Sequence, residues 1–377
     1  MSNDNHRVPQ HATTWRIDTG MSAERQTVLV TGGAGFIGST LVRSLLTGSD
    51  YDVVTLDKLT YAGNLDSLSP LLSHPSHRFV HGDIGDAALV RALLERHRPV
   101  GIMHLAAESH VDRSIDVPAD FLLTNVMGTF TLLTEARRFW EQQRVSGHPF
   151  RFIHVSTDEV FGSLGPDGHF APDSAYDPSS PYSATKAASD HLVRAWGRTY
   201  GLPVIVTNCS NNYGPHQFPE KLIPLIILSA LIDRPLPVYG AGTNVRDWLY
   251  VDDHAAALRA AFERGEPGET YLFGGRAERT NLEVVQAICD LVDARLGRSG
   301  TQSTRHRIEF VADRPGHDFR YAIDPSKAER ALGWRAEVAF EEGLARTVEW
   351  YLANDEWCER VRTGAYRLER AGLGSPA

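Results

Sequence analysis

The stretch Thr27-Val-Leu-Val-Thr-Gly-Gly-Ala-Gly-Phe-Ile-Gly38 decides the fold of this chain. A short β-branched run leads into glycines and then into the periodic apolar residues of 36–46, which predicts a strand, a tight turn and a helix. The glycines fit Gly33-x-Gly35-x-x-Gly38 or Gly32-x-x-Gly35-x-x-Gly38, and either spacing lets backbone amides at a helix N-terminus approach a pyrophosphate. Because such a match alone is weak, the interpretation as a dinucleotide site depends on the residues that follow.

The next predicted strand, residues 51–57, ends in Asp57, which comes 19 residues after Gly38. A dinucleotide fold places here the carboxylate that binds a ribose 2′-hydroxyl, and this carboxylate would repel the 2′-phosphate of NADP. The sequence therefore favours NAD, although the neighbouring cation Lys58 softens the discrimination. The alternative for Asp57 is an ordinary loop carboxylate after a strand.

Short β-rich runs alternate with longer helical stretches, which predicts an α/β fold: a Rossmann-like, doubly wound parallel sheet with helices on both faces. Ligands of such sheets bind at the carboxyl ends of the strands. Residues 82–84, 104–109, 157–159 and 208–214 all fall at such ends, so we expect one site at one edge. The predicted strands lie near 27–31, 52–57, 78–82, 101–105, 151–156 and 203–208.

The alternation breaks after Gly214, where the proline-rich and loop-rich residues 215–242 predict a smaller mixed α/β lobe that binds the substrate. We expect this lobe to comprise about 211–242 plus 276–370. Residues 26–210 plus about 243–275 would form the NAD-binding Rossmann domain, with the second segment returning a strand and a helix to it. The polar residues 1–25 are predicted to be a disordered extension.

Composition limits the classes of function. The 377 residues carry a formal charge of −9, from 38 basic and 47 acidic side chains, which gives no basic stripe for nucleic acid. The most apolar run, residues 222–232, contains a proline and is far shorter than the roughly 20 residues that cross a bilayer, so it predicts a buried helix and no membrane span. Cys209, Cys289 and Cys358 form no C-x-x-C pair, which predicts a reducing cytoplasm and no metal site.

Two groups of residues indicate a reaction. Thr157, Asp158 and Glu159 follow a predicted strand, while Tyr182 and Lys186 are one helical turn apart on one face. The ammonium would stabilise a tyrosine phenolate, which otherwise forms too rarely at neutral pH to serve as a base. Tyr-x-x-x-Lys also arises by chance on amphipathic helices, where the tyrosine is half-buried and the lysine reaches solvent.

Eight stretches of the chain resemble those of the dTDP-glucose 4,6-dehydratases of the extended short-chain dehydrogenase/reductase superfamily. The resemblance covers roughly residues 26–366, and its Thr-Asp-Glu triplet separates these dehydratases from nucleotide-sugar epimerases of similar fold. Phe161 and Thr185 are small departures from the family pattern. The stretches are residues 31–38, 57–64, 104–114, 156–159, 182–186, 211–215, 219–222 and 246–251.

The resemblance implies a lyase of deoxysugar biosynthesis that converts dTDP-D-glucose into dTDP-4-keto-6-deoxy-D-glucose and water. Tyr182 would take the proton of the 4-hydroxyl as C4 is oxidised, with Lys186 holding the phenolate and the cofactor ribose. Glu159 would then remove the C5 proton, and a protonated Asp158 would give its proton to the departing C6 hydroxyl before hydride returns to C6. NAD would be tightly bound and recycled in each turnover. Thr157 would orient the 4-oxygen, unless it only caps the backbone.

The resemblance also implies the residues that bind the two ligands. Among the substrate residues, Arg246 is the candidate for the diphosphate, because a guanidinium is a forked and permanently charged donor. The NAD site would comprise Gly32, Gly35, Phe36, Ile37, Gly38, Asp57, Lys58, Leu59, Thr60, Asp83, Ile84, Leu105, Ala106, Ala107, Thr124, Tyr182, Lys186 and Asn212. The nucleotide-sugar site would comprise Ser109, Thr157, Asn211, Lys221, Leu222, Pro237, Tyr239, Arg246, Asn281 and His317.

Helices expected near 119–141 and 182–200 carry apolar residues beyond one core-facing stripe. A second buried face predicts a homodimer, and relatives pair through helices there. The residues concerned are Phe121, Phe130, Phe139, Trp140, Leu192 and Trp196.

Three alternatives stay open at this point. A UDP-sugar 4-epimerase would share the fold, NAD, Tyr182 and Lys186, but it would give Asp158 and Glu159 no task. A dehydratase for another nucleotide sugar is the second, although one that uses a GDP-sugar would want NADP, which Asp57 disfavours. A non-catalytic NAD-binding module is the third, and it could dispense with all four of these side chains. The later use of the product and the preference for thymine over uracil also stay open.

Overall fold

The computed structural model describes residues 25–364 of the 377-residue chain. The predicted extension, residues 1–25, lies outside the described residues except for Arg25.

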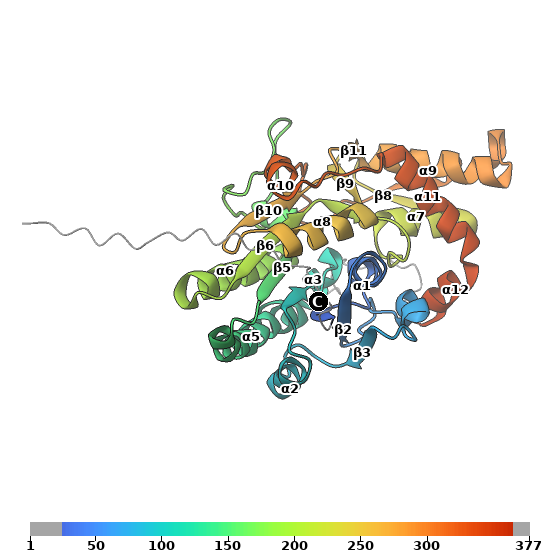
Figure 1. Ribbon diagram of the computed structural model, residues 1–377. Coiled ribbons are helices and arrows are strands. Elements are labelled where there is room, and N and C mark those ends of the chain that lie inside the picture. The colour runs from blue at the N-terminus through green and yellow to red at the C-terminus, as the bar shows by residue number, and fades with distance from the viewer. Residues whose placement is uncertain (1–24, 365–377) are drawn as a thin grey trace, which may run out of the picture.

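A seven-stranded parallel sheet forms the centre of the larger part of the molecule (Figure 1). Its strand order is β10-β6-β5-β4-β1-β2-β3, and every neighbouring pair runs parallel. The predicted doubly wound fold and its six strands are confirmed, and β10 adds a seventh strand that was not predicted. The strands are β1 (Gln26–Thr31), β2 (Tyr51–Asp57), β3 (His77–His81), β4 (Gly101–His104), β5 (Arg151–Thr157), β6 (Val204–Cys209) and β10 (Thr270–Phe273).

Helices cover both faces of this sheet because successive strand side chains point to opposite sides. Val28 and Val30 of β1 join the core beneath α1 and α8, whereas Leu29 joins the core beneath α2, α5 and α6. The strand order reverses between β1 and β4, so a crevice is expected at the carboxyl ends of these strands. These helices are α1 (Phe36–Gly48), α2 (Ala87–His97), α5 (Thr129–Gln143), α6 (Pro181–Tyr200) and α8 (Val251–Arg264).

A smaller lobe contains a three-stranded mixed sheet, β11-β9-β7, and a two-stranded parallel sheet, β12-β8. Its core joins aromatic side chains such as Tyr213, Trp248 and Tyr250 to the apolar faces of the surrounding helices. The predicted buried helix over residues 222–232 is confirmed as α7. The elements are β7 (Asn211–Tyr213), β8 (Leu236–Tyr239), β9 (Val245–Tyr250), β11 (Glu278–Thr280), β12 (Ile308–Val311), α7 (Leu222–Leu231), α9 (Asn281–Leu296), α11 (Phe340–Ala353) and α12 (Asp355–Gly364).

Two elements, β9 and α10, belong to the other lobe than the one predicted for them. Strand β9 was expected to return to the large sheet, but it pairs with β7 and β11, so this prediction is wrong. The strand that the large sheet gains within residues 243–275 is the unpredicted β10. Almost every residue of β9 is buried, and a strand that is buried on both faces does not reveal by its sequence which sheet it joins. Helix α10 (Ser326–Leu332) contributes Ala328 and Leu332 to the core of the large sheet.

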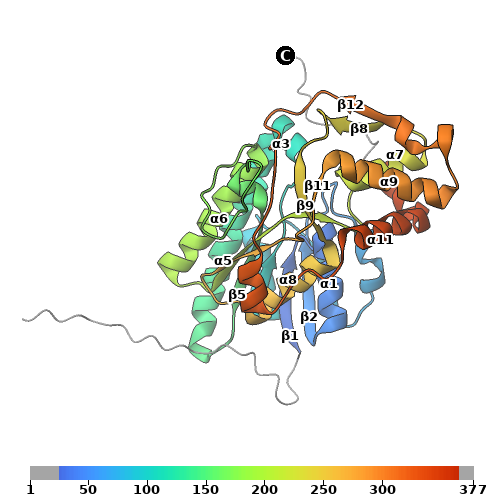
Figure 2. The same ribbon diagram turned by 90° about the horizontal axis from the view of Figure 1, so that it is seen from above.

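The remaining elements are short helices, and one of them, α3, contacts the smaller lobe. Figure 2 shows α3 near β8 and β12, and the hydroxyl of Tyr239 donates to Oδ2 of Asp112 in α3 at 3.0 Å. The short elements are α3 (Val111–Asp116), α4 (Pro118–Phe121), the π-helix η2 (Leu122–Gly128), and the 3₁₀ helices η1 (Leu65–Leu71), η3 (Arg144–Ser146), η4 (Asp158–Phe161), η5 (Gly300–Gln302) and η6 (Thr304–Arg307).

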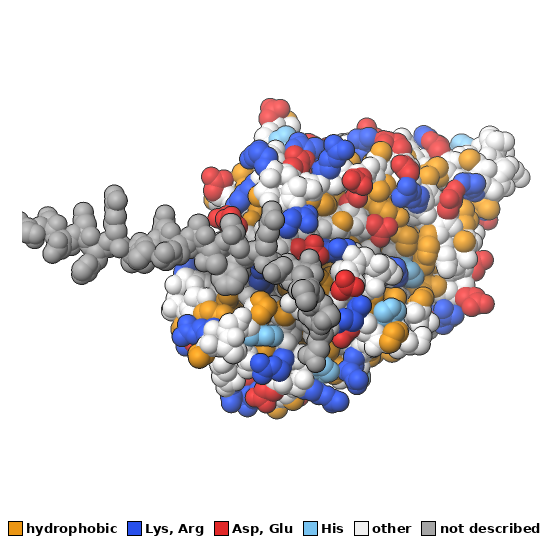
Figure 3. Space-filling view, viewed as in Figure 1, with side chains coloured by type: hydrophobic (Ala, Val, Ile, Leu, Met, Phe, Trp, Pro, Cys, Tyr) orange, Lys and Arg blue, Asp and Glu red, His pale blue; other side chains and the backbone are white. Residues whose placement is uncertain are grey.

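On the face seen in Figure 3, Lys and Arg side chains are interspersed with Asp and Glu. Within residues 25–364, the helices are all too short or too polar to traverse a bilayer.

Candidate active site

A cavity of about 290 Å³ opens at the carboxyl ends of the large sheet, where strands β1 to β6 meet the smaller lobe. Its wall contains all five predicted catalytic residues and every predicted NAD-site residue except Leu59. Leu59 has a positive φ of 53°, and its side chain packs against the core beneath α1. The ends of six parallel strands, β1 to β6, therefore bring residues from distant parts of the sequence together.

The glycine turn and Asp57 form one unit. A Cβ on Gly38 would lie 2.1 Å from the carbonyl oxygen of Gly32, so only glycine lets this turn close. Asp57 accepts hydrogen bonds from the backbone N–H groups of Ala34 at 2.9 Å and Leu59 at 2.8 Å. Gly32, Gly35 and Gly38 line the cavity and Gly33 does not, which favours the Gly32-x-x-Gly35-x-x-Gly38 spacing.

This unit fits an adenine dinucleotide. Helix α1 begins after Gly35 without a side-chain cap, and Phe36 and Ile37 of its first turn line the cavity. Nζ of Lys58, the cation that would attract a 2′-phosphate, lies 3.2 Å from Oδ2 of Asp83. Where the adenosine ribose of the cofactor is expected, the cavity thus offers a carboxylate and a lysine that is paired with Asp83. This arrangement suits NAD better than NADP.

Asp158 and Glu159 form an asymmetric acid pair at the end of β5. Thr157 caps the 3₁₀ helix η4, since its Oγ1 accepts from the Glu159 N–H at 3.3 Å and donates to Oδ1 of Asp158 at 3.3 Å. The other carboxyl oxygen of Asp158 is buried without a hydrogen-bond partner among the described residues.

The two carboxyl groups differ in how their charges are balanced. Burial, and then the charge of Glu159, raise the pKa of Asp158 well above its usual range. Burial also raises the pKa of Glu159, but the positive charges of Arg314, Lys221 and Arg246 oppose that shift. Asp158 is therefore the member of the pair that takes up a proton more readily.

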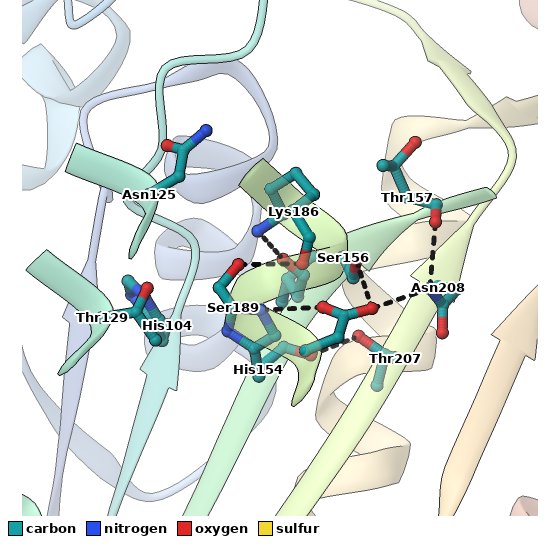
Figure 4. Close-up of polar contacts among 12 residues, drawn as sticks. His104, Asn125, Thr129, His154, Ser156, Thr157, Lys186, Ser189, Thr207 and Asn208 are labelled. Carbon is teal, nitrogen blue, oxygen red and sulfur yellow. Dashed lines mark hydrogen bonds and ion pairs between the residues drawn. The ribbon is translucent and has the colours of Figure 1, made fainter. Parts of the chain in front are cut away.

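Tyr182 and Lys186 lie on the buried face of α6, one turn apart as predicted. The Tyr182 ring packs edge-on against Phe121, with 6.3 Å between ring centroids. Burial and the charge of Glu159 raise the pKa of Tyr182, whereas the Thr157 side chain lowers it. The Lys186 ammonium donates to the carbonyl oxygen of Val155 at 2.9 Å, and Figure 4 shows the polar residues around it, among them His154, Ser156 and Asn208.

The predicted substrate residues fall into two groups. Ser109, Asn211 and Lys221 line the cavity beside the catalytic residues, and Lys221 Nζ donates to the Ser109 carbonyl oxygen at 2.9 Å. The others lie outside the cavity wall, around the loop of residues 313–318 and the adjoining strands and helices. This second group comprises Leu222, Pro237, Tyr239, Arg246, Asn281 and His317.

Arg246 and His317 show how the second group is held. The Arg246 guanidinium donates to the carbonyl oxygens of Val245, Asp318 and Phe319 and lies 4.2 Å from the Tyr321 ring centroid. Nδ1 of His317 lies 2.6 Å from Oδ1 of Asp313.

Several residues of the site are not among those predicted from the sequence. Arg314 pairs with Asp112 at 3.2 Å and contributes to the positive charge around Glu159. It lies in the same loop as the predicted His317, so the loop was recognised but not its arginine. Glu220 lines the cavity, and its adjacency to the predicted Lys221 was the available signal. Within the described part of the chain, no group of three His, Cys, Asp or Glu side chains is arranged to hold a metal.

Comparison with known proteins agrees with this geometry. A family model described as GDP-mannose 4,6 dehydratase matches residues 29–347. Fold and site together define a nucleotide-sugar-modifying enzyme of the short-chain dehydrogenase/reductase class. Over 360 residues the chain is 53% identical to a dTDP-glucose 4,6-dehydratase of Escherichia coli, covering 92% of this chain and 99% of that one. The chain belongs to the dTDP-glucose 4,6-dehydratase family.

Solved structures give the same result. A dTDP-glucose 4,6-dehydratase of Streptomyces venezuelae, crystallised with NAD, is similar with a TM-score of 0.82 and 47% identity, over 89% of this chain and 100% of that one. A UDP-glucose 4-epimerase of Thermus thermophilus, in complex with NAD, is similar with a TM-score of 0.76 and 29% identity, over 87% of this chain and 100% of that one. The fold is thus shared with epimerases, and the acid pair has to distinguish the reactions.

Proposed function

We propose that this protein is an NAD-dependent dTDP-glucose 4,6-dehydratase, which converts dTDP-glucose into dTDP-4-keto-6-deoxyglucose and water. The observation that carries the proposal is the asymmetric acid pair beside Tyr182. A 4-epimerase needs the tyrosine and the lysine but has no use for a buried, protonated Asp158 next to Glu159. Asp57, bound to the glycine turn, supports NAD as the cofactor and weighs against a dehydratase that uses NADP.

Tyr182 takes the proton of the sugar 4-hydroxyl in the first step. Because burial raises its pKa, the phenolate depends on nearby positive charge, and Lys186 supplies one cation from the next turn of α6. NAD⁺, when bound, would supply a second positive charge and accept the hydride from C4, and the NADH so formed would return it to C6. Thr157, whose side chain interacts with both Tyr182 and Asp158, holds the 4-oxygen between them.

The acid pair then performs the elimination. Oxidation at C4 makes the C5 proton acidic, and Glu159, whose charge is supported by three cations, removes it. Asp158 holds its proton and gives it to the C6 hydroxyl, which leaves as water. The unpartnered carboxyl oxygen of Asp158 is the atom available for this transfer.

We also propose that residues 26–210 plus about 243–275 bind NAD, and that the smaller lobe binds the nucleotide sugar. Lys221, Ser109 and Asn211 would contact the sugar inside the cavity. Arg246 would contact the diphosphate, with Pro237, Tyr239, Leu222, Asn281 and His317 around the rest of the nucleotide.

The enzyme is further proposed to act as a homodimer. Two of the apolar residues that led to the prediction of a dimer, Phe121 and Phe139, are buried within their own subunit. Exposed apolar side chains nevertheless follow the adjacent helix face: Leu123 is 64% exposed, Met127 52% and Phe130 40%, at positions i, i+4 and i+7 beside α6. A second copy of the chain is the partner that would cover this face symmetrically.

The three cysteines support a reducing, cytoplasmic location. All three are buried, and Cys209 and Cys289 are free thiols.

The assignment is tested by incubating the purified protein with dTDP-glucose in deuterated water without added NAD. Mass spectrometry and NMR should show loss of water, a C6 methyl group and one deuterium at C5. A 4-epimer formed without loss of water would indicate an epimerase. No conversion, even with added NAD and other sugar nucleotides, would indicate a non-catalytic module.

A further inference from the structure

A buried carboxylate lies one turn beyond Lys186 on α6. Tyr182, Lys186 and Asp190 follow one face of the helix at four-residue spacing, and Asp190 is 0% exposed. Asp190 lies outside the cavity wall, and the steps described above do not use it. A charge buried this completely is costly unless it is paired, so its partners need to be identified.

The contacts of Asp190 lead to the catalytic strand. Its Oδ2 accepts hydrogen bonds from Ser156 Oγ at 2.9 Å, from the Tyr176 hydroxyl at 2.7 Å and from Asn208 Nδ2 at 3.5 Å. The same amide of Asn208 donates to the carbonyl oxygen of Thr157 at 2.9 Å (Figure 4). These bonds connect α6 to the ends of β5 and β6, but they do not by themselves balance a negative charge.

The titratable groups around Asp190 come from four elements and one loop. Burial lowers the pKa of His154, on β5, to about 4, and it lowers the pKa of His104, on β4, well below its usual range. Burial raises the pKa of Cys209, on β6, and of Tyr176, in the loop before α6. All four groups are therefore neutral near pH 7, including His154, whose Nε2 lies 3.1 Å from Oδ1 of Asp190.

Among residues 25–364, the cations next to Asp190 on α6 are Lys186, one helical turn before it, and Arg194, one turn after it. Arg194 is only partly buried and stacks on Tyr176, with its guanidinium carbon 5.0 Å from the ring centroid. Lys186 is fully buried and donates to one carbonyl oxygen. Burial lowers the pKa of Lys186, and the charge of Asp190 opposes this shift. For Asp190 the directions are reversed. Burial raises its pKa, but His154 and Lys186 lower it, and the net shift is downward.

We propose that Asp190 is a positioning residue of the reaction, the buried counter-charge that keeps the Lys186 ammonium cationic beneath Tyr182. Asp190 acts through Lys186 and does not touch the substrate. The role of Lys186 in turnover rests on the proposed function, whereas the pairing of the two charges does not.

The first test compares the pH dependence of kcat/KM for the wild type, Asp190→Asn, Ser156→Ala and Tyr176→Phe. Asn keeps the shape of the side chain and removes its charge, whereas the other two changes remove donors to the carboxylate and keep the charge. On the alkaline side of the pH profile, kcat/KM should fall as Lys186 loses its proton. In Asp190→Asn this fall should occur at a pH lower by one unit or more. The two controls should keep the wild-type limb. An unmoved alkaline limb in Asp190→Asn would overturn the proposal.

The second test needs no turnover, so it separates this proposal from the dehydratase assignment. Urea unfolding is measured for the wild type, Lys186→Met, Asp190→Asn and the double variant. If the two charges are partners, the double variant should unfold at a higher urea concentration than Asp190→Asn alone. Losses of stability that simply add would contradict the proposal, as would an Asp190→Asn variant that does not fold and is not rescued by Lys186→Met.

Discussion

The hydroxyl of Tyr61 donates a 3.2 Å hydrogen bond to Oε1 of Glu220, which lies 159 residues further along the chain. Tyr61 lies between Thr60 and Ala62, which line the cavity from the loop after β2, and Glu220 lines it from the segment before α7. The guanidinium carbon of Arg113 lies 3.6 Å from the centroid of the Tyr61 ring. The contact joins the loop that follows Asp57 to the segment that carries Lys221, so it links the proposed NAD and sugar sites.

Tyr61→Phe should weaken the retention of NAD. The substitution keeps the ring beneath Arg113 and removes one hydrogen bond, which is typically worth about 0.5–1.5 kcal/mol, or roughly a 2- to 10-fold faster release of NAD. The release rate can be followed by fluorescence, together with the NAD content of the purified protein. Tyr200→Phe, at an exposed tyrosine near the end of α6, is the matched control and should release NAD like the wild type. Equal release from both variants would show that this contact does not hold the cofactor.

Glu220→Gln should change how stability depends on pH. Burial raises the pKa of Glu220 from 4.5 to about 7, so between these values the folded protein binds a proton that the unfolded chain has released. The free energy of unfolding contributed by this group therefore falls as the pH rises through that window, by roughly 3 kcal/mol in all. Relative to the wild type, Glu220→Gln should gain stability at about pH 8 and show no gain below about pH 4.5.

Urea unfolding over this pH range checks the prediction for Glu220. The same substitution at the exposed Glu309 serves as the control, and its difference from the wild type should be flat with pH. A flat difference for Glu220→Gln as well would mean that the buried carboxyl titrates normally.

Asp158→Asn should block the elimination. The amide keeps the shape of the side chain but cannot give a proton to the C6 hydroxyl, and loss of a general acid typically lowers kcat by a factor on the order of 10²–10⁴. Proton removal by Tyr182 would remain, so the variant should accumulate reduced cofactor, which absorbance can detect. The control is Asp167→Asn, at an exposed carboxylate in the loop before α6. Wild-type kcat in Asp158→Asn would remove the acid pair from the mechanism.

The double substitution Leu123→Glu with Met127→Glu should produce a monomer. It places two charges on the exposed apolar face beside α6, where they would have to be buried against a second subunit. Light scattering after gel filtration measures the mass, and Val145→Glu, at a side chain that is 89% exposed outside this face, should leave the mass unchanged. A double variant with the wild-type mass would place the subunit interface elsewhere.

Much of the site could be predicted because local sequence signals mark it. The glycine turn, Asp57 at a strand end, and the Tyr182 and Lys186 pair each depend on spacing within a single element, and a parallel sheet then brings strand ends together. Leu59 shows the limit of such signals, since its positive φ turns the side chain toward the core.

The features that were missed depend on contacts between distant segments. Strand β10 has only four residues, all buried, and β9 is buried along almost its whole length, so its sequence would suit either sheet. Arg314 is held by its ion pair with Asp112, which lies 202 residues earlier in the chain. Asp190 is held by hydrogen bonds from Ser156 and Tyr176, which lie outside its helix. No periodicity reports such pairings.

The most direct test of the proposed mechanism follows the hydrogen atom on C4 of the sugar. The enzyme is supplied with dTDP-glucose deuterated at C4, in ordinary water, and the product is examined by NMR and mass spectrometry. If one bound NAD accepts hydride from C4 and returns it to C6 of the same molecule, the deuterium should appear in the C6 methyl group. Deuterium that stays at C4, or is lost to solvent, would contradict the account.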